Sequence, residues 1–279
     1  MTTRSSVVAG SFYPGDNTTL QKMLSLFIKK DIKKTNNVLA VVAPHAGYVY
    51  SGKTAGVVYS SIQIPSTVII LSPNHTGLGY PISIDPSDNW ETPLGLIDLD
   101  TSFINRIKQE FKEAKLDTSA QTKEHALEVQ LPFIQYLNPK AKIVPITLAG
   151  LDLSTMQRLG QVLAKIMLEV EKETGSRPLI VASSDMTHFE SAEAARKKDM
   201  MAVEKIKDLD TKGFILLVEK EDISMCGLYT VPVAMEVALQ YTKQKGLKPK
   251  VELIDYTNSG EVTGDNSEVV AYAGMVISF

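Results

Sequence analysis

Cysteine and long apolar runs are both scarce in this sequence. The 279 residues include one cysteine, Cys226, so no disulfide can form within the chain. No apolar run reaches the roughly 18 residues that a membrane-spanning helix requires, and no membrane association is expected. The apolar stretch near the N-terminus is too short for a signal peptide. Together these absences predict a cytoplasmic protein.

An excess of charge of one sign is also missing. The chain has 29 basic and 32 acidic residues and a net charge of −3. A nucleic-acid surface needs clustered basic residues, whereas the lysines here are scattered along predicted helices, so no nucleic-acid partner is expected. Hydrophobic residues make up 44% and charged residues 22% of the chain, which is the ordinary balance of a globular protein with a full core.

What the sequence does contain is an alternation of apolar runs and amphipathic stretches. The apolar runs are rich in β-branched residues, as is typical of strands covered on both faces; they span 38–44, 67–73, 141–150, 178–185, 250–257 and 268–278. The amphipathic stretches predict helices at 101–114, 154–173, 191–210 and 231–246. Because no long linker separates them, we predict a single α/β domain over 1–279, with a mixed, largely parallel sheet flanked by helices.

Two of these helices carry recognisable terminal signals. Ser154 and Gln157 have the spacing of a capping box and predict the start of the helix at 154–173. Pro232 and Gly246 lie near the two ends of the helix at 231–246, where proline and glycine are favoured.

Polar residues follow three of the predicted strands directly. His45 comes one residue after the run 38–44, His75 two after 67–73, and Asp185 and His188 end or follow 178–185. Ligands of open α/β sheets bind at the carboxyl ends of the strands. If these strands run parallel, the four side chains converge in one pocket, and we expect Cys226 to join them.

Each of these residues also has an ordinary structural explanation. His125 precedes an apolar stripe that predicts a helix face, with Glu124 and Glu128 as charges in its first turn. Asp185 has the residue type of a helix N-cap. Cys226 is either an inert buried residue or a thiolate whose pKa is lowered by a following helix, able to hold a soft metal.

Several motifs in a fixed order resemble the Memo family, the archaeal and bacterial relatives of the eukaryotic mediator of cell motility. They are "AGSFYPGD", "APHAGYVYSG", "LSPNHTG", "EHALEVQLPF", "SSDMTH", "MCG" and "VVAYAGM", and the resemblance runs from about residue 4 to 278. The family's fold is similar to that of the LigB-type class III extradiol dioxygenases, which are non-haem iron enzymes. The resemblance therefore implies a LigB-like α/β fold with one pocket at the strand ends.

The resemblance also implies roles for individual residues. It makes His45, His75 and Cys226 the expected metal ligands. The dioxygenases bind iron with two histidines and a carboxylate, so a cysteine here is a departure that leaves dioxygenase activity open. A thiolate favours Fe(II) or copper, with zinc less expected.

Three further residues are expected to work beside the metal. Asp185 and His188 resemble the family's other pocket residues, with His188 placed like the acid–base histidine of the ring-cleaving enzymes. His125 resembles a histidine that lines the same pocket and is the weaker catalytic candidate.

Three functions remain open from the sequence. The first is a redox or dioxygenase-like enzyme acting on an unknown small molecule. The second is a non-catalytic module that binds metal or peptide, and the third is a metal-dependent hydrolase with His188 or Glu124 as the base. Relatives in prokaryotes also imply a radical-SAM protein as a partner.

Overall fold

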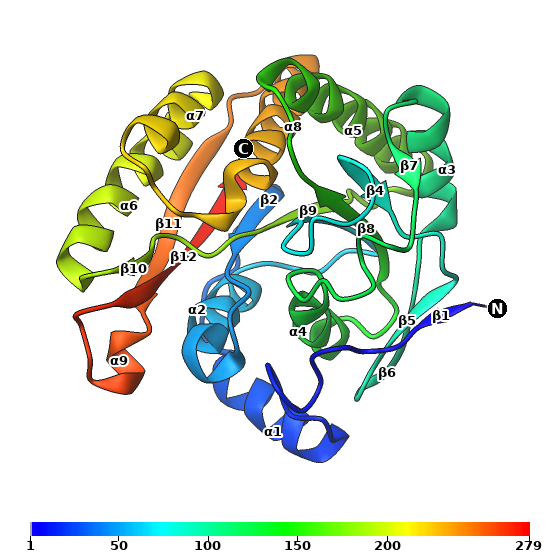
Figure 1. Ribbon diagram of the computed structural model, residues 1–279. Coiled ribbons are helices and arrows are strands. Elements are labelled where there is room, and N and C mark those ends of the chain that lie inside the picture. The colour runs from blue at the N-terminus through cyan, green and yellow to red at the C-terminus, as the bar shows by residue number, and fades with distance from the viewer. Residues whose placement is uncertain (1) are drawn as a thin grey trace.

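A computed structural model describes residues 2–279 and has one extended sheet at its centre (Figure 1). Within these residues nine strands form this sheet in the order β10-β12-β2-β9-β3-β8-β4-β7, with β11 also paired to β12. Their bounds are β2 (Val38–Ala43), β3 (Thr67–Pro73), β4 (Ile82–Ile84), β7 (Lys115–Leu116), β8 (Lys142–Leu148), β9 (Leu179–Ser183), β10 (His188–Glu190), β11 (Lys250–Asn258) and β12 (Val269–Ser278).

The middle of the sheet is parallel and its edges are mixed. Strand β9 lies between β2 and β3 and pairs in parallel with both, and β3 pairs in parallel with β8. Strands β12 and β11 add antiparallel pairs on one side, and β4 adds one on the other. The predicted mixed α/β sheet is confirmed, and β2, β3 and β9 end at the same edge.

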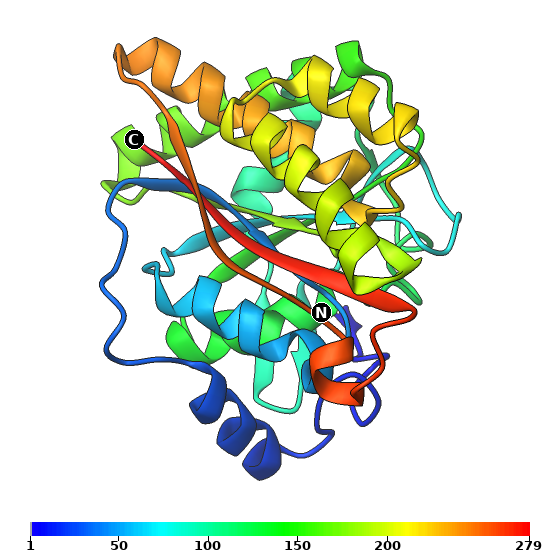
Figure 2. The ribbon, with the colours of Figure 1, turned by 90° about the vertical axis from the view of Figure 1, so that its left-hand side faces the viewer.

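Helices cover both faces of this sheet, as the turned view in Figure 2 shows. On one face α8 packs against β2 and β9 and is covered by α5 and α7, while α6 packs on β11 and β12. On the other face α2 contacts β11 and β12, and α1 and α4 pack against α2. The helices are α1 (Asn17–Phe27), α2 (Tyr48–Ser60), α3 (Thr101–Glu110), α4 (Leu131–Leu137), α5 (Leu153–Thr174), α6 (Ala192–Lys207), α7 (Thr211–Lys220), α8 (Thr230–Lys245) and α9 (Gly260–Thr263).

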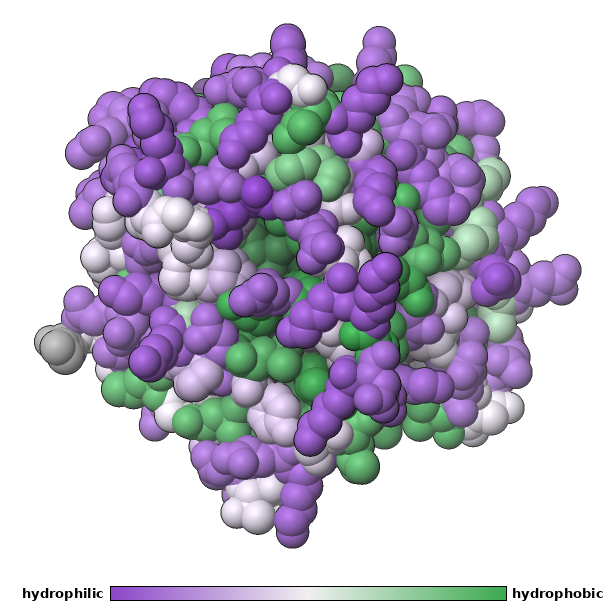
Figure 3. Space-filling model, turned by 180° about the vertical axis from the view of Figure 1, so that it is seen from behind, coloured by the Kyte–Doolittle hydropathy of each residue, from purple (hydrophilic) through white to green (hydrophobic). Residues whose placement is uncertain are grey.

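A smaller sheet and two short 3₁₀ turns complete the chain. The small sheet consists of β1 (Thr3–Arg4), β5 (Asn89–Thr92) and β6 (Gly95–Asp98). Strand β5 lies in the middle and pairs with both of the others. The 3₁₀ turns are η1 (Glu128–Gln130) and η2 (Cys226–Leu228). The elements share one continuous apolar core, and hydrophilic residues dominate the face seen in Figure 3. Among the described residues, no helix is long and apolar enough to cross a membrane.

The predicted start of α5 is wrong in detail. The helix begins at Leu153, and Asp152 caps it by accepting a hydrogen bond from the Thr155 backbone N–H at 2.7 Å. Ser154 therefore lies inside the first turn, where it cannot act as the cap. The end of α8 is as predicted, because Gly246 adopts a left-handed φ of 67° that favours glycine.

Candidate metal centre

Six polar residues lie together at the carboxyl edge of the parallel strands. His45 follows β2 and His75 follows β3, and their ring centroids are 5.2 Å apart. Cys226 Sγ lies 3.4 Å from His75 Nε2 and 3.8 Å from His188 Nε2. The carboxylate of Asp185 accepts a hydrogen bond from the His45 backbone N–H at 2.7 Å. The sixth residue, His125, comes from the loop before η1 and has its ring centroid 4.7 Å from that of His75.

His45 has one ring nitrogen that is held and one that is free. Its Nδ1 lies 3.0 Å from the hydroxyl of Ser183, and that hydroxyl donates to the Ala126 carbonyl at 2.7 Å. Since the single hydroxyl proton is already used, His45 Nδ1 must be the donor, which leaves the lone pair on Nε2. This Nε2 is buried and has no hydrogen-bond partner among the described residues. Burial, reinforced by the nearby His75, lowers the pKa of His45 to about 3, so its ring is neutral at physiological pH.

His75 is held by a buried carboxylate. Glu124 is fully buried, and its Oε1 lies 2.9 Å from His75 Nδ1 while its Oε2 accepts from the His75 backbone N–H at 2.7 Å. Burial alone would lower the pKa of His75, but the hydrogen bond and the charge of Glu124 raise it above its ordinary value. The same contacts lower the pKa of Glu124 in spite of its burial.

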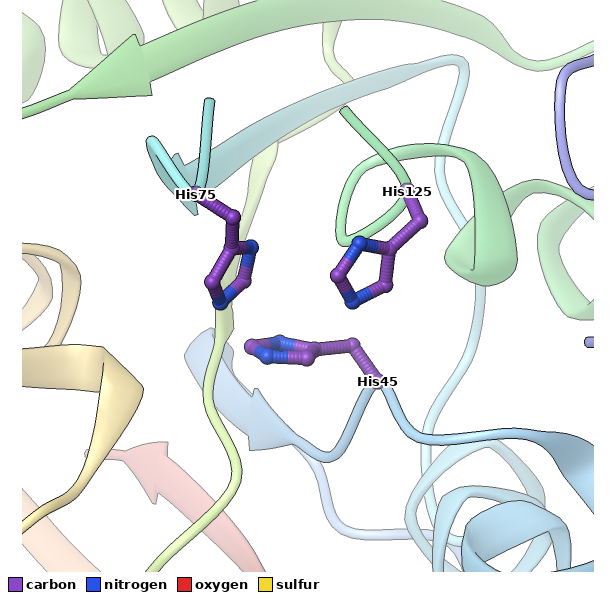
Figure 4. A group of neighbouring side chains, drawn as sticks. All are labelled: His45, His75 and His125. Carbon is purple, nitrogen blue, oxygen red and sulfur yellow. The ribbon is translucent and has the colours of Figure 1, made fainter. Parts of the chain in front are cut away.

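His125 lies between an aromatic ring and His75. Its ring is 4.7 Å from the rings of both Phe12 and His75, by centroid, and is nearly parallel to that of His75. Figure 4 shows the outer nitrogens of His75 and His125 pointing toward His45. One ligand atom from each of these three histidines lies within 4.8 Å of the others, so the trio could hold a metal ion. Burial and the neighbouring His45 lower the pKa of His125 to about 4.

The predicted helix around His125 is wrong at its start. Residues 124 and 125 precede the 3₁₀ turn η1, and α4 begins only at Leu131. The reason lies in the two glutamates, which bind other segments rather than the first turn of their own helix. Glu124 accepts from His75, and Glu128 accepts from the backbone N–H groups of Val7 and Val8.

Cys226 begins the 3₁₀ turn η2, and its backbone N–H donates to the Asp185 carbonyl at 3.2 Å. The glycine that follows is required, because a Cβ at Gly227 would lie 2.3 Å from Ser184 Oγ. The predicted lowering of the Cys226 pKa is wrong. Burial, followed by the charge of Asp185, raises it to about 12, and α8 begins only at Thr230, after the 3₁₀ turn. A bound cation would act in the opposite direction.

Asp185 and His188 lie on the segment that follows β9. Asp185 is not a helix N-cap, since it binds the His45 N–H, and burial raises its pKa. His188 Nδ1 is buried without a hydrogen-bond partner in the part of the chain described. The segment is anchored by Asp199 of α6, which accepts from both the backbone N–H and the hydroxyl of Thr187, at 3.0 and 2.6 Å.

Several residues that fix the positions of the candidate ligands, or of the segments that carry them, were not predicted from the sequence. Ser183, Gln130 and Asp199 were not identified, and Glu124 was weighed only as a helix charge or a base. Ser183 is a polar residue at the end of an otherwise apolar, fully buried strand. A buried polar group needs a hydrogen-bond partner. The serine at the end of this apolar run is therefore the sequence signal that could have identified Ser183.

The fold and site define an α/β protein with a cluster of histidine, cysteine and carboxylate side chains at the carboxyl edge of its parallel strands. A family model described as Memo-like protein matches residues 4–276, and the chain belongs to the Memo family. It is 40% identical over 277 residues to a MEMO1 family protein of Aquifex aeolicus, covering 99% of each chain. It is 41% identical over 269 residues to one of Archaeoglobus fulgidus, covering 96% of this chain and 97% of the other.

A solved structure, that of an uncharacterized protein from Escherichia coli K12, shares the fold. It has a TM-score of 0.52 and 11% sequence identity, and the match covers 85% of this chain and 99% of that one. At this identity the likeness supports the fold alone. The relation to LigB-type dioxygenases that the sequence implied stays a prediction.

Proposed function

We propose that the pocket binds an iron or copper ion through His45 Nε2, His75 Nε2 and Cys226 Sγ. On this proposal the protein is a redox or dioxygenase-like enzyme that acts on a small molecule. Two imidazole nitrogens and a thiolate form a soft donor set, which suits Fe(II) and copper. When bound, such an ion would supply one-electron chemistry and would act as a Lewis acid toward the substrate.

The observation that carries the proposal is the free nitrogen of His45. A buried acceptor without a partner costs about 1 to 3 kcal/mol, so proteins seldom keep one without a purpose. Among the described residues this Nε2 has no hydrogen-bond partner, and its tautomer is held by Ser183 on the far side of the ring. A lone pair fixed in this way and facing His75 is what a metal ligand requires.

The chain's own residues would move protons beside the ion. His188 Nε2 lies 3.8 Å from Cys226 Sγ, which places the imidazole within one water's reach of a metal-bound group. Asp185 holds the His45 backbone and its charge interacts with His188, so its carboxylate would stabilise an imidazolium that forms on His188. His125, neutral at physiological pH, is the second candidate for accepting a proton.

Elemental analysis of protein purified without oxygen or added metal tests the proposal. We expect about one iron or copper per chain, lost when His45 is replaced by alanine. Zinc in its place would support the hydrolytic alternative, and bound iron or copper without any turnover would support a metal-binding module. Protein that neither carries nor takes up any of these metals would refute the proposal.

A further inference from the structure

Glu124 is the buried carboxylate of the pocket that the proposed metal site leaves without a role. It has no exposed surface, and its backbone carbonyl accepts from the guanidinium of Arg4 at 2.8 Å. Its side chain therefore projects from an anchored loop. Within residues 2–279, the polar contacts of this carboxylate are with the segment carrying His75 and with the loop that carries Glu124 itself.

The hydrogen bonds of this carboxylate determine which nitrogen of His75 carries the proton. One backbone N–H donates to each oxygen: that of Ala126 to Oε1 at 2.9 Å and that of His75 to Oε2 at 2.7 Å. Two such donors stabilise the acceptor-only form of a carboxylate. The ring Nδ1 of His75, 2.9 Å from Oε1, must then be the donor, and its lone pair lies on Nε2.

That Nε2 points at the third expected ligand. It lies 3.4 Å from Cys226 Sγ, and the ring of His45 is 5.2 Å away by centroid. We infer that Glu124 is the positioning residue of this centre, which fixes the ring orientation and tautomer of His75 so that Nε2 is presented to a metal ion. This inference rests on the proposed function.

The contact of the Glu124 carboxylate with the neighbouring histidine, His125, is weaker. His125 Nδ1 lies 3.5 Å from Glu124 Oε1, beyond the length of a good hydrogen bond, and that oxygen already receives two donors. The tautomer of His125 is therefore not fixed by Glu124. A ring that can carry its proton on either nitrogen suits proton transfer, whereas a ring with one fixed lone pair suits a ligand.

Glu128 supplies a matched control for Glu124. It is equally buried and lies four residues further along the chain, but its carboxylate binds Arg4, Tyr13 and the backbone N–H groups of Val7 and Val8. Replacing either glutamate by glutamine removes a buried charge at nearly constant volume. Only Glu124→Gln removes a contact with a proposed ligand.

The experiment titrates metal-free wild type, Glu124→Gln and Glu128→Gln with Co(II) without oxygen, following the thiolate-to-metal absorption band. Changes in residues that orient metal ligands cost about 10- to 100-fold in affinity, and we expect that loss for Glu124→Gln only. Wild-type affinity in Glu124→Gln, or an equal loss in both variants, would overturn the inference.

Long-range ¹H–¹⁵N spectra of the histidine rings in metal-free protein give a second readout. At a pH above the raised pKa of His75, where its ring is neutral, we expect the Nδ1–H form in wild type and in Glu128→Gln, and a tautomer mixture in Glu124→Gln. An Nε2–H form of His75 in wild type would overturn the inference without any variant. If wild type binds no Co(II), the proposed function fails, and the spectra alone decide whether Glu124 sets the tautomer.

Discussion

Replacing Ser183 by alanine should weaken both the fold and the metal site, because one hydroxyl serves three buried groups. It accepts from His45 Nδ1 at 3.0 Å and from Gln130 Nε2 at 2.9 Å, and it donates to the Ala126 carbonyl at 2.7 Å. An unpaired buried polar group costs about 1 to 3 kcal/mol. Gln130 Nε2 keeps the Pro44 carbonyl at 3.0 Å, so the two groups left unpaired should cost at least about 2 kcal/mol. For a chain of this size that loss lowers the melting temperature by on the order of 4 °C or more.

The neighbouring serine is the control for this change. Ser184 is also fully buried, but its hydroxyl donates only to the Asp185 carbonyl at 2.7 Å, and that carbonyl keeps a second donor in the Cys226 N–H. Ser184→Ala should therefore cost about 1 kcal/mol. Chemical denaturation measures both variants, and anaerobic metal titration should show an affinity loss of about 10- to 100-fold for Ser183→Ala alone. Equal stabilities for the two variants would refute the hydrogen-bonding role assigned to Ser183.

Three further predictions concern Cys226 and His188. Cys226→Ser should keep its circular dichroism spectrum and lose most of its iron or copper, since a hydroxyl is a far weaker ligand for soft metals. Unchanged metal content in this variant would show that Cys226 is not a ligand. His188→Ala should keep its metal content while reducing any turnover, and an empty site would make His188 a ligand instead. Because the pKa of Cys226 is raised to about 12, alkylation of metal-free protein by iodoacetamide should be slow at pH 8 and should accelerate up to pH 11; a plateau below pH 9 would contradict the raised pKa.

The sheet was predictable from the sequence because its signals are local. The central strands are buried runs of β-branched residues, and the predicted runs 38–44, 67–73 and 178–185 differ from β2, β3 and β9 by two residues or fewer at each end. The alternation of such runs with predicted helices further along the chain indicated a largely parallel sheet. This was enough to bring the polar residues after these strands to one edge.

Helix α2 was missed for a physical reason. Amphipathic periodicity arises when one face of a helix is wet, but most residues of Tyr48–Ser60 are buried between the sheet and the layer of α1 and α4. Such a helix has no polar stripe to detect. The same limit applies to the start of α4, where Glu124 binds a residue 49 positions away and Glu128 one that is 121 positions away. Contacts of this range cannot be read from a local pattern.

The pKa shifts in the pocket differ between the candidate ligands. The pKa values of His75 and Cys226 are raised, so a metal ion must displace a proton there, whereas His45 and His125 offer no such competition. The pKa values of His45 and His125 are lowered to about 3 and 4, so neither ring holds a proton that a metal ion must displace at neutral pH. The carboxylates of Asp185 and Glu124 act in the opposite direction at Cys226, where they help raise the pKa of the thiol. Burial is the larger cause of that shift, and the negative charge that the carboxylates add would stabilise a divalent cation at the same place. Burial thus keeps the lone pairs of His45 and His125 available, while the carboxylates supply the charge that holds a cation among them.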